Sequence, residues 1–354
     1  MLTHSPIRLI GGAVFSCVLL YLLFISPSSR SCTDDGYHSS LFSGFRHSSS
    51  RLTYYDMDRP QETTSQTDNR GQSQRRLDHV LILTPFKNSA QHIGRYFDNL
   101  DKLTYPHDHI SLGFLVSDSQ DGTIELLQQR AKDYMQHSER NAPWQTFHRV
   151  NIFQKDFAYE LASNEDRHAF SVQVKRRQIM AKSRNTLLSA ALTQEIDWVL
   201  WLDGDVVDYP PSLLEELMGL DKDIVVPNCY WHSYNEIGGY DRNNWVETEE
   251  SWAFQSTLKP SDVLVEGYDE LVTHRKLLLD MRFEDGQTDL FHTVPLDAVG
   301  GTCTLVKAKV HRDGAIFPSF PFQHQVETEG MAKMAKALGY EIFGLPNYLV
   351  YHYI

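Results

Sequence analysis

The ten residues from Trp198 to Val207, WVLWLDGDVV, decide how the rest of the chain is interpreted. They begin with five apolar residues, a run typical of a buried strand. Asp203 and Asp205 follow this run directly, and Gly204 between them permits a turn that aims both carboxylates at one crevice. Divalent cations such as Mg²⁺ and Mn²⁺ prefer oxygen ligands of this kind. The same spacing also arises by chance in acidic proteins, where it marks a solvated turn.

Outward from this stretch, short β-rich runs alternate with helical patterns. The predicted strands are 79–84, 110–117, 148–153, 197–202 and 223–227. The predicted helices are 90–103, 123–137, 172–192 and 211–218. This alternation indicates an α/β fold with βαβ units on a largely parallel sheet. Such sheets bind ligands beyond the carboxyl ends of their strands, so the residues directly after each strand are the first candidates for a site.

Three further candidates for nucleotide binding come from these positions and from the long helix. Pro85 and Phe86 lie in the expected loop after the first strand, where Phe86 can hold a nucleobase. Asp118 follows the second strand and can accept hydrogen bonds from a ribose or base. Arg184 belongs to a cluster of cations on helix 172–192 that can neutralise a diphosphate. The alternatives are a proline turn and a solvated helix face, and for Asp121 a helix cap is favoured.

The composition excludes several classes of protein. The chain has 354 residues, 41% of them hydrophobic, and a formal net charge of −13. It is too apolar to be disordered throughout, and its acidic balance argues against nucleic acid as the main partner, because neutralising phosphates requires clustered Lys and Arg. Residues 1–76 hold eight basic and six acidic residues, so the acidity belongs to residues 77–354. These exclusions leave two classes of protein, an enzyme or a protein-binding domain.

The N-terminal region predicts a membrane anchor. Leu9–Ile25 carries no charge and spans 17 residues, at the short end of the roughly 17 to 25 that cross a bilayer. A cleaved signal peptide is the alternative, but the run exceeds the usual signal core of about 7 to 15 residues. We therefore expect a type II membrane protein with four segments. These are a cytoplasmic tail at 1–8, one transmembrane helix at 9–25, a flexible luminal stem at 26–76 and a luminal catalytic domain at 77–354.

Two other features leave alternatives open. A disulfide between Cys229 and Cys303 is compatible with a lumen but not required. The motif His311–Gly314 (HRDG) is interpreted as a structural turn. Several aromatic residues cluster after the fifth predicted strand, where they can stack on sugars or cover a partner interface, and these are Tyr230, Trp231, Tyr234, Tyr240, Trp245 and Trp252.

Three long motifs carry a resemblance to a known family. They are WVLWLDGDVVDYPPSLLEEL at 198–217, VLVEGYDELVTHR at 263–275 and the stretch from LDAVGGTCTLVKAKVHRDG through VETEGMAKMAKALGYEIFGLPNYLVYH at 296–352. Over residues 78–353 the sequence resembles the fungal mannan polymerase family of Golgi mannosyltransferases. The resemblance implies a GT-A glycosyltransferase fold, with a Rossmann-like nucleotide-sugar-binding sheet and an acceptor-side subdomain. It also implies GDP-mannose as donor, Mn²⁺ as cofactor, and homologous subunits as partners.

The family's site residues carry over at matching positions. Its metal and nucleotide-sugar acids fall on Asp203 and Asp205, with Asp205 as the direct metal ligand, and its metal-binding histidine falls on His352. Gly204 stands where the resemblance implies alanine. We expect little effect from this difference, because both carboxylates remain.

The reaction that the resemblance implies is α-1,6-mannosyl transfer to the outer chain of N-linked glycans, with retention of configuration. Such a transfer needs no general base, because the departing phosphate can take the acceptor proton. Asp297 and Glu327 are then the predicted substrate-side carboxylates. Their alternative roles are a turn before paired glycines and an acid favoured at a helix N-terminus.

Two alternatives to an active transferase come from other classes. One is a non-catalytic or weakly active scaffolding subunit of a polymerase complex. The other, a glycosidase with paired carboxylates, leaves the Asp-Gly-Asp turn behind a buried strand unexplained. Intact Asp203, Asp205 and His352 favour the enzyme over the scaffold.

Overall fold

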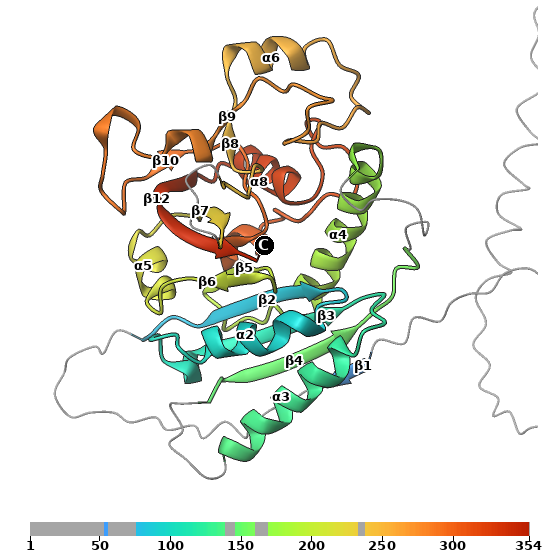
Figure 1. Ribbon diagram of the computed structural model, residues 1–354, viewed down its shortest axis with the longest axis vertical. Coiled ribbons are helices and arrows are strands. Elements are labelled where there is room, and N and C mark those ends of the chain that lie inside the picture. Colours follow the sequence, from blue (N-terminus) through green and yellow to red (C-terminus); the bar gives the residue numbers. More distant parts are fainter. Residues whose placement is uncertain (1–52, 56–75, 139–145, 160–168, 233–237, 354) are drawn as a thin grey trace, which may run out of the picture. The chain divides into compact units, whose positions relative to one another are not determined.

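The structure is a computed structural model, and it describes residues 53–55, 76–138, 146–159, 169–232 and 238–353 (Figure 1). The predicted anchor and most of the predicted stem lie outside these residues. No helix within the described ranges is long and apolar enough to cross a membrane. The fold is therefore described for the domain that follows the stem.

The Asp-Gly-Asp turn follows a central strand of the main sheet. On one side of this strand the sheet is parallel, in the order β4-β3-β2-β5. The strands are β2 (Val80–Phe86), β3 (Ile110–Val116), β4 (Arg149–Gln154) and β5 (Trp198–Leu202). The helices between them are α2 (Ala90–Leu100), α3 (Thr123–Ser138) and α4 (Phe170–Ala191). The predicted βαβ alternation is confirmed for this half.

The other half of the sheet is mixed, so the prediction of a largely parallel sheet is wrong there. The strand after β5 in the sheet is β11, which runs antiparallel to both β5 and β7, whereas β7 and β12 are parallel. Short strands β6 and β10 pair antiparallel with β12. The bounds are β6 (Val206–Asp208), β7 (Ile224–Trp231), β10 (Val294–Pro295), β11 (Cys303–Lys307) and β12 (Ile342–His352).

A long excursion joins β7 to β11, in place of the βαβ crossover that would make the two strands parallel. Its described residues, 232 and 238–302, contain the two-stranded sheet of β8 and β9, the strand β10 and one α-helix (Figure 1). Its elements are β8 (Trp245–Val246), α6 (Glu249–Gln255), β9 (Lys276–Leu277), η3 (Leu278–Met281) and η4 (Glu284–Gly286).

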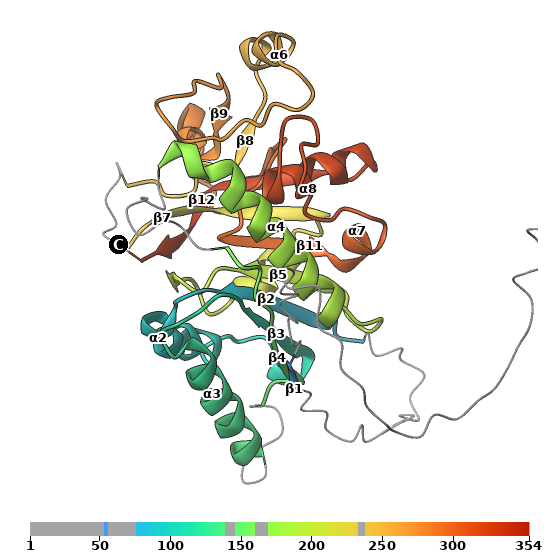
Figure 2. The same cartoon turned by 90° about the vertical axis from the view of Figure 1, so that its right-hand side faces the viewer.

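Helices cover both faces of the sheet and form two hydrophobic cores (Figure 2). One core contains residues of α2, α3 and α5 (Leu213–Gly219), and the other contains residues of α4, α7 (Ala308–Arg312) and α8 (Glu327–Ala337). In β5, Leu200 enters the first core and Val199 and Trp201 enter the second. Burial on both faces is the reason why this strand is continuously apolar.

Two predicted strands continue beyond their expected ends, and one further strand lies in the predicted stem. β2 continues through Phe86, and β7 continues from Pro227 to Trp231. The pairing of β7 with β12 shifts register beyond Pro227, so this proline lies at an irregularity and not at the end of the strand. Thr53–Tyr55, in the predicted stem, forms β1 and pairs antiparallel with β4. Thr and Tyr favour strands, which explains this pairing in an otherwise polar segment.

Cys229 and Cys303 lie on the neighbouring strands β7 and β11 and are both buried free thiols. Burial raises the pKa of each thiol. The disulfide that the sequence leaves open is not formed.

Three histidines meet at the amino ends of the parallel strands, on the edge of the sheet away from the Asp-Gly-Asp turn. His79 precedes β2, His109 ends the short helix η1 (His107–His109), and His148 precedes β4. The His79 ring centroid lies 4.7 Å from that of His109 and 5.1 Å from that of His148. Burial, together with nearby positive charge, lowers the pKa of His79 and His148 from the ordinary value of 6.5.

This histidine cluster predicts a loss of stability in acid. Because the folded pKa values lie below the unfolded ones, the unfolded chain binds more protons, and stability present above pH 6.5 is lost as the pH falls through the folded pKa values. His148→Gln cannot gain this charge. Between pH 7.5 and 5, we expect its melting temperature to fall by about 2 °C less than that of the wild type.

The measurement is a thermal unfolding series over pH, and His292→Gln, a histidine outside the cluster, is the control. Identical pH profiles for wild type and His148→Gln would contradict the prediction.

Candidate active site

Backbone hydrogen bonds fix the Asp203–Gly204–Asp205 turn at the carboxyl end of β5. The Asp203 amide donates to the Thr302 carbonyl at 3.0 Å, and the Val206 amide donates back to the Asp203 carbonyl at 3.2 Å. The Tyr353 amide donates to the Asp205 carbonyl at 2.9 Å. The turn is therefore held between the residues that lead into β11 and the residue that follows β12.

Arg184 of α4 joins two of the predicted carboxylates. Its Nη2 donates to Asp203 Oδ1 at 3.0 Å and its Nε donates to Glu327 Oε1 at 2.7 Å. Arg184 is 1% exposed, and its guanidinium lies 5.3 Å from the Trp201 ring centroid. Glu327 is the first residue of α8 and is itself buried. The structure thus brings together Asp203, Arg184 and Glu327 from three separate elements.

Two consecutive glycines make room for buried charges. A β-carbon at Gly301 would lie 2.2 Å from Arg184 Nη2, and one at Gly300 would lie 1.9 Å from Asp241 Oδ2. Asp241 is 2% exposed and accepts a hydrogen bond of 2.7 Å from the Thr302 hydroxyl. Sequence reasoning missed Asp241, because a single aspartate among aromatic residues forms no motif. The paired glycines were the available signal of a close approach at this point.

His352, at the end of β12, contacts the second carboxylate of the turn. Its Nε2 lies 3.0 Å from Asp205 Oδ2, and its Nδ1 lies 2.6 Å from the Tyr353 carbonyl oxygen. The imidazole stacks on Tyr240 with a centroid distance of 3.6 Å and an interplanar angle of 17°. A carbonyl oxygen can only accept, so Nδ1 carries a proton and donates a hydrogen bond to the Tyr353 carbonyl. The other ring nitrogen, Nε2, faces Asp205.

The two aspartates of the turn have opposite electrostatic environments. Burial raises the pKa of Asp203 to about 6, although Arg184 opposes the rise. Burial would also raise the pKa of Asp205, but the hydrogen bond and charge of His352 outweigh it and lower that pKa. Burial would lower the pKa of His352, but Asp205 outweighs it and raises that pKa. Asp205 is therefore the carboxylate that stays ionised most readily.

Asp205 and His352 fit a divalent cation by donor chemistry. A carboxylate oxygen and an imidazole nitrogen face each other, and the histidine donates its other N–H to a backbone carbonyl, the usual support of a metal-binding histidine. Among the described residues, no three acidic, histidine or cysteine side chains are gathered as a complete metal site. Asp205 and His352 would be two of the ligands, and Mn²⁺ or Mg²⁺ commonly fills other positions with water and substrate phosphates.

The prediction that Phe86 holds a nucleobase does not fit the structure. Pro85 and Phe86 lie inside β2 and not in a loop after it. The Phe86 ring is 1% exposed and packs against the rings of Tyr96 and Phe114 at centroid distances of 5.4 and 5.7 Å. Its faces are covered by protein because the strand continues two residues further than the sequence indicates.

Asp118 supports the loops at the same edge of the sheet. It has a left-handed backbone with φ of 47°, and its carboxylate accepts hydrogen bonds from the amides of Phe157 at 3.2 Å and Ala158 at 3.1 Å. It thereby joins the end of β3 to the loop after β4, and nucleotide binding by Asp118 stays a prediction. Asp121 accepts hydrogen bonds at the starts of α2 and α3, from the Ala90 and Thr123 amides, in agreement with its expected capping role.

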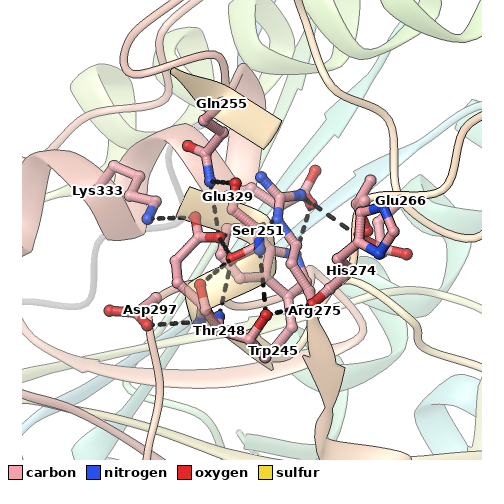
Figure 3. A network of polar contacts seen from close by, with 12 residues as sticks. Trp245, Thr248, Ser251, Gln255, Glu266, His274, Arg275, Asp297, Glu329 and Lys333 are labelled. Carbon is pink, nitrogen blue, oxygen red and sulfur yellow. Dashed lines mark hydrogen bonds and ion pairs between the residues drawn. The ribbon is translucent and has the colours of Figure 1, made fainter. Parts of the chain in front are cut away.

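Asp297 lies in a second group of polar residues. Its carboxylate pairs with Lys336 and accepts a hydrogen bond of 2.8 Å from the Glu247 amide. The side chains beyond it form a buried ion network, shown in Figure 3, that consists of Glu247, Glu266, Arg275, Glu329 and Lys333. The partners of Asp297 are thus different from Arg184, which joins Asp203 and Glu327.

The buried ion network surrounds Trp245 of β8. The Arg275 guanidinium lies 3.6 Å from the Trp245 ring centroid, and the indole N–H donates to Glu329 Oε1 at 2.8 Å. Glu329 also pairs with Arg177, one of the cations predicted on α4. Glu327 and Glu329 therefore connect the start of α8 to Arg184 and Arg177 of α4. The predicted sugar-stacking role of Trp245 does not fit this placement, because the side chain is buried among charged residues.

His311, in the predicted HRDG turn, has a structural role as expected. It lies in α7 and is buried, its Nε2 accepts a hydrogen bond of 3.0 Å from the Trp201 indole, and its Nδ1 lies 2.7 Å from the Ala315 carbonyl oxygen. Burial lowers its pKa to about 4. A neutral histidine with both nitrogens engaged is a packing residue.

Comparison with known proteins places this arrangement in a family. Residues 52–321 match the family described as Anp1. The chain is 43% identical over 285 residues to the mannan polymerase complex subunit MNN9 of Candida albicans, covering 78% of this chain and 75% of that protein. It is 39% identical over 300 residues to the mannan polymerase complex subunit mnn9 of Schizosaccharomyces pombe, covering 84% and 85%.

Among solved structures, the chain is similar to the mannosyltransferase PcManGT from Pyrobaculum calidifontis in complex with GDP-Man and Mn²⁺. The TM-score is 0.42 at 14% identity, over 77% of this chain and 56% of that one. This value is too low to support any statement about function. The sequence relatives suffice for the assignment: the chain belongs to the Anp1 family, and the resemblance to fungal mannan polymerase subunits is confirmed.

The ion pairs of Arg184 predict a large effect on stability. Arg184→Ala leaves two carboxylates without their partner, and breaking a buried pair in this way costs about 3 to 5 kcal/mol. Denaturant unfolding measures the loss. Lys182→Ala, an exposed position on the same helix, is the control, with an expected change within about 0.5 kcal/mol. Equal losses for the two variants would show that the Arg184 pairs do not contribute to the fold.

Proposed function

We propose that this chain is a GT-A glycosyltransferase that transfers mannose from GDP-mannose as a subunit of a mannan polymerase complex. The observation that carries the proposal is the convergence of polar side chains at the carboxyl end of β5, the edge where α/β sheets bind ligands. These side chains are Asp203, Asp205, Arg184, Glu327 and His352. Membership of the Anp1 family, and relatives named as mannan polymerase subunits, support the assignment to mannan synthesis.

Asp205 and His352 are the proposed ligands of Mn²⁺. When bound, the metal supplies Lewis acidity that offsets the charge growing on the diphosphate leaving group. The stacking of His352 on Tyr240 and its contact with the Tyr353 carbonyl keep the imidazole oriented toward Asp205. The chain thus holds both donors in place before any substrate arrives.

Arg184 positions the carboxylates that face the donor sugar. It holds Asp203 and Glu327 through different nitrogens, so neither carboxylate can turn away without leaving a buried charge unpaired. Carboxylates held in this way stabilise the positive charge that develops on the sugar ring. Asp297, tied to Lys336 and to the Glu247 amide, acts on the acceptor side by supporting the buried ion network.

The proposed product is an α-1,6-linked mannose on the outer chain of an N-linked glycan, formed with retention of configuration. In a retaining transfer the departing phosphate accepts the acceptor proton on the same face of the sugar. No separate general base is required of the chain. The role of its residues is therefore to bind, orient and stabilise charge.

We propose a type II orientation in the Golgi membrane, with Leu9–Ile25 as the anchor and the catalytic domain in the lumen. The uncharged run of 17 residues, preceded by Arg8, supports this location. The proposed partners are homologous subunits, because the relatives are named as members of complexes. The same names favour a second candidate function, a scaffold that organises a catalytic homologue.

A transfer assay distinguishes the two functions. The full chain, alone and with a homologous subunit, is given GDP-mannose, Mn²⁺ and α-1,6-mannobiose. We expect Asp205→Ala and His352→Ala each to lower the rate roughly 100-fold or more, because each removes a group that stabilises developing charge. EDTA should abolish transfer and added Mn²⁺ should restore it.

The matched control is Asp98→Ala, an exposed aspartate of α2, which should transfer at the wild-type rate. Transfer that requires the partner and is unchanged by Asp205→Ala would contradict the enzyme and support the scaffold.

A further inference from the structure

The ring of Phe86 lies directly against Gly204, the middle residue of the Asp-Gly-Asp turn. A β-carbon at position 204 would lie 2.2 Å from Phe86 Cε1, 2.8 Å from Cδ1 and 3.2 Å from Cζ. Carbon atoms in contact normally lie about 3.5 to 4.0 Å apart. The space above the ring therefore admits a hydrogen atom at position 204 but not a methyl group. The expectation that glycine in place of alanine has little effect does not fit this contact, because it considered only the two carboxylates and not the ring beside them.

Phe86 cannot move aside. It is 1% exposed and packs edge to face against Tyr96, whose hydroxyl donates to the Thr84 hydroxyl at 2.6 Å. The Thr84 hydroxyl donates in turn to the Leu202 carbonyl at 2.7 Å, and Leu202 directly precedes Asp203. The residues that hold the ring also hold the end of β5.

The turn cannot move away from the ring either. Its position is fixed on the far side by the hydrogen bonds of the Asp203 amide to Thr302 and of the Tyr353 amide to the Asp205 carbonyl. Asp203 is tied to Arg184 and Asp205 to His352 by their side chains. Any shift at Gly204 therefore changes the positions of both carboxylates.

We propose that Phe86 is a positioning residue. Its ring fixes the position of the Gly204 backbone and thereby the spacing of the Asp203 and Asp205 carboxylates. Residues 86 and 204 are sterically coupled, so a larger residue at 204 requires a smaller one at 86. The coupling depends on packing alone. Its consequence for metal and donor binding rests on the proposed function.

The test is a double-mutant cycle in the full chain, with Gly204→Ala, Phe86→Leu and the double variant. Forcing a methyl group against the ring should lower the melting temperature of Gly204→Ala by about 2 to 8 °C. It should also weaken Mn²⁺ binding about tenfold, measured from the spectroscopic signal of free Mn²⁺. Because Phe86→Leu removes ring atoms and leaves space, the double variant should recover most of the Mn²⁺ affinity. Its melting temperature should also be higher than the value expected from adding the shifts of the two single variants.

Two matched controls separate this coupling from general packing. Gly94→Ala changes a glycine whose β-carbon would meet no atom within 4 Å, and it should not weaken Mn²⁺ binding. Phe114→Leu removes the same atoms from a neighbouring buried ring, and it should not rescue Gly204→Ala. KM for GDP-mannose should rise in Gly204→Ala and return toward the wild-type value when Phe86→Leu is added, which a purely structural role would not produce.

Each outcome decides the proposal. Additive melting shifts, or rescue by Phe114→Leu, would overturn the coupling. Non-additive shifts with equal Mn²⁺ affinity in every variant would overturn the positioning role and leave Phe86 a packing residue. A wild-type chain that binds Mn²⁺ but transfers no mannose, with the cycle still non-additive, supports the coupling and counts against the proposed transferase.

Discussion

The rest of the site depends on one buried charge. The Arg184 guanidinium is 1% exposed, so it must be neutralised where it lies, and the two carboxylates that do so come from the end of β5 and the start of α8. These elements can satisfy Arg184 only when the sheet and the helices on its second face are fully assembled. The fold and the site are therefore fixed by the same contacts.

The small residues of the site have the same explanation as the charged ones. Gly301 leaves the volume that Arg184 fills, Gly300 leaves the volume that Asp241 fills, and Gly204 leaves the volume that the Phe86 ring fills. Each glycine lies beside a large or charged side chain from another part of the chain. Glycine is needed at these positions because of a close approach and not because of backbone conformation, since the φ of none of the three is in the left-handed region.

Local sequence patterns predicted the parallel half of the sheet, because its strands and helices follow each other in βαβ units. They did not predict β11, a five-residue strand whose partners β5 and β7 lie about a hundred and about eighty residues earlier in the chain. Asp203 and Asp205 could be found from their place after an apolar run, and His352 only from the family resemblance. The contacts of Glu327 with Arg184 and of Asp297 with Lys336 are tertiary, so no local pattern could separate their roles.

The central position of β11 has a consequence for folding. Until Cys303–Lys307 inserts, β5 and β7 each present an unpaired edge to solvent, and both strands are almost wholly apolar. Pairing β11 with β5 closes a loop of about a hundred residues, whereas pairing β2 with β3 and β3 with β4 closes loops of about 30 and about 40 residues, so the β11 contacts cost more entropy and form more slowly. A nascent chain therefore exposes unpaired edges of β5 and β7 to solvent for the time needed to synthesise the excursion between β7 and β11.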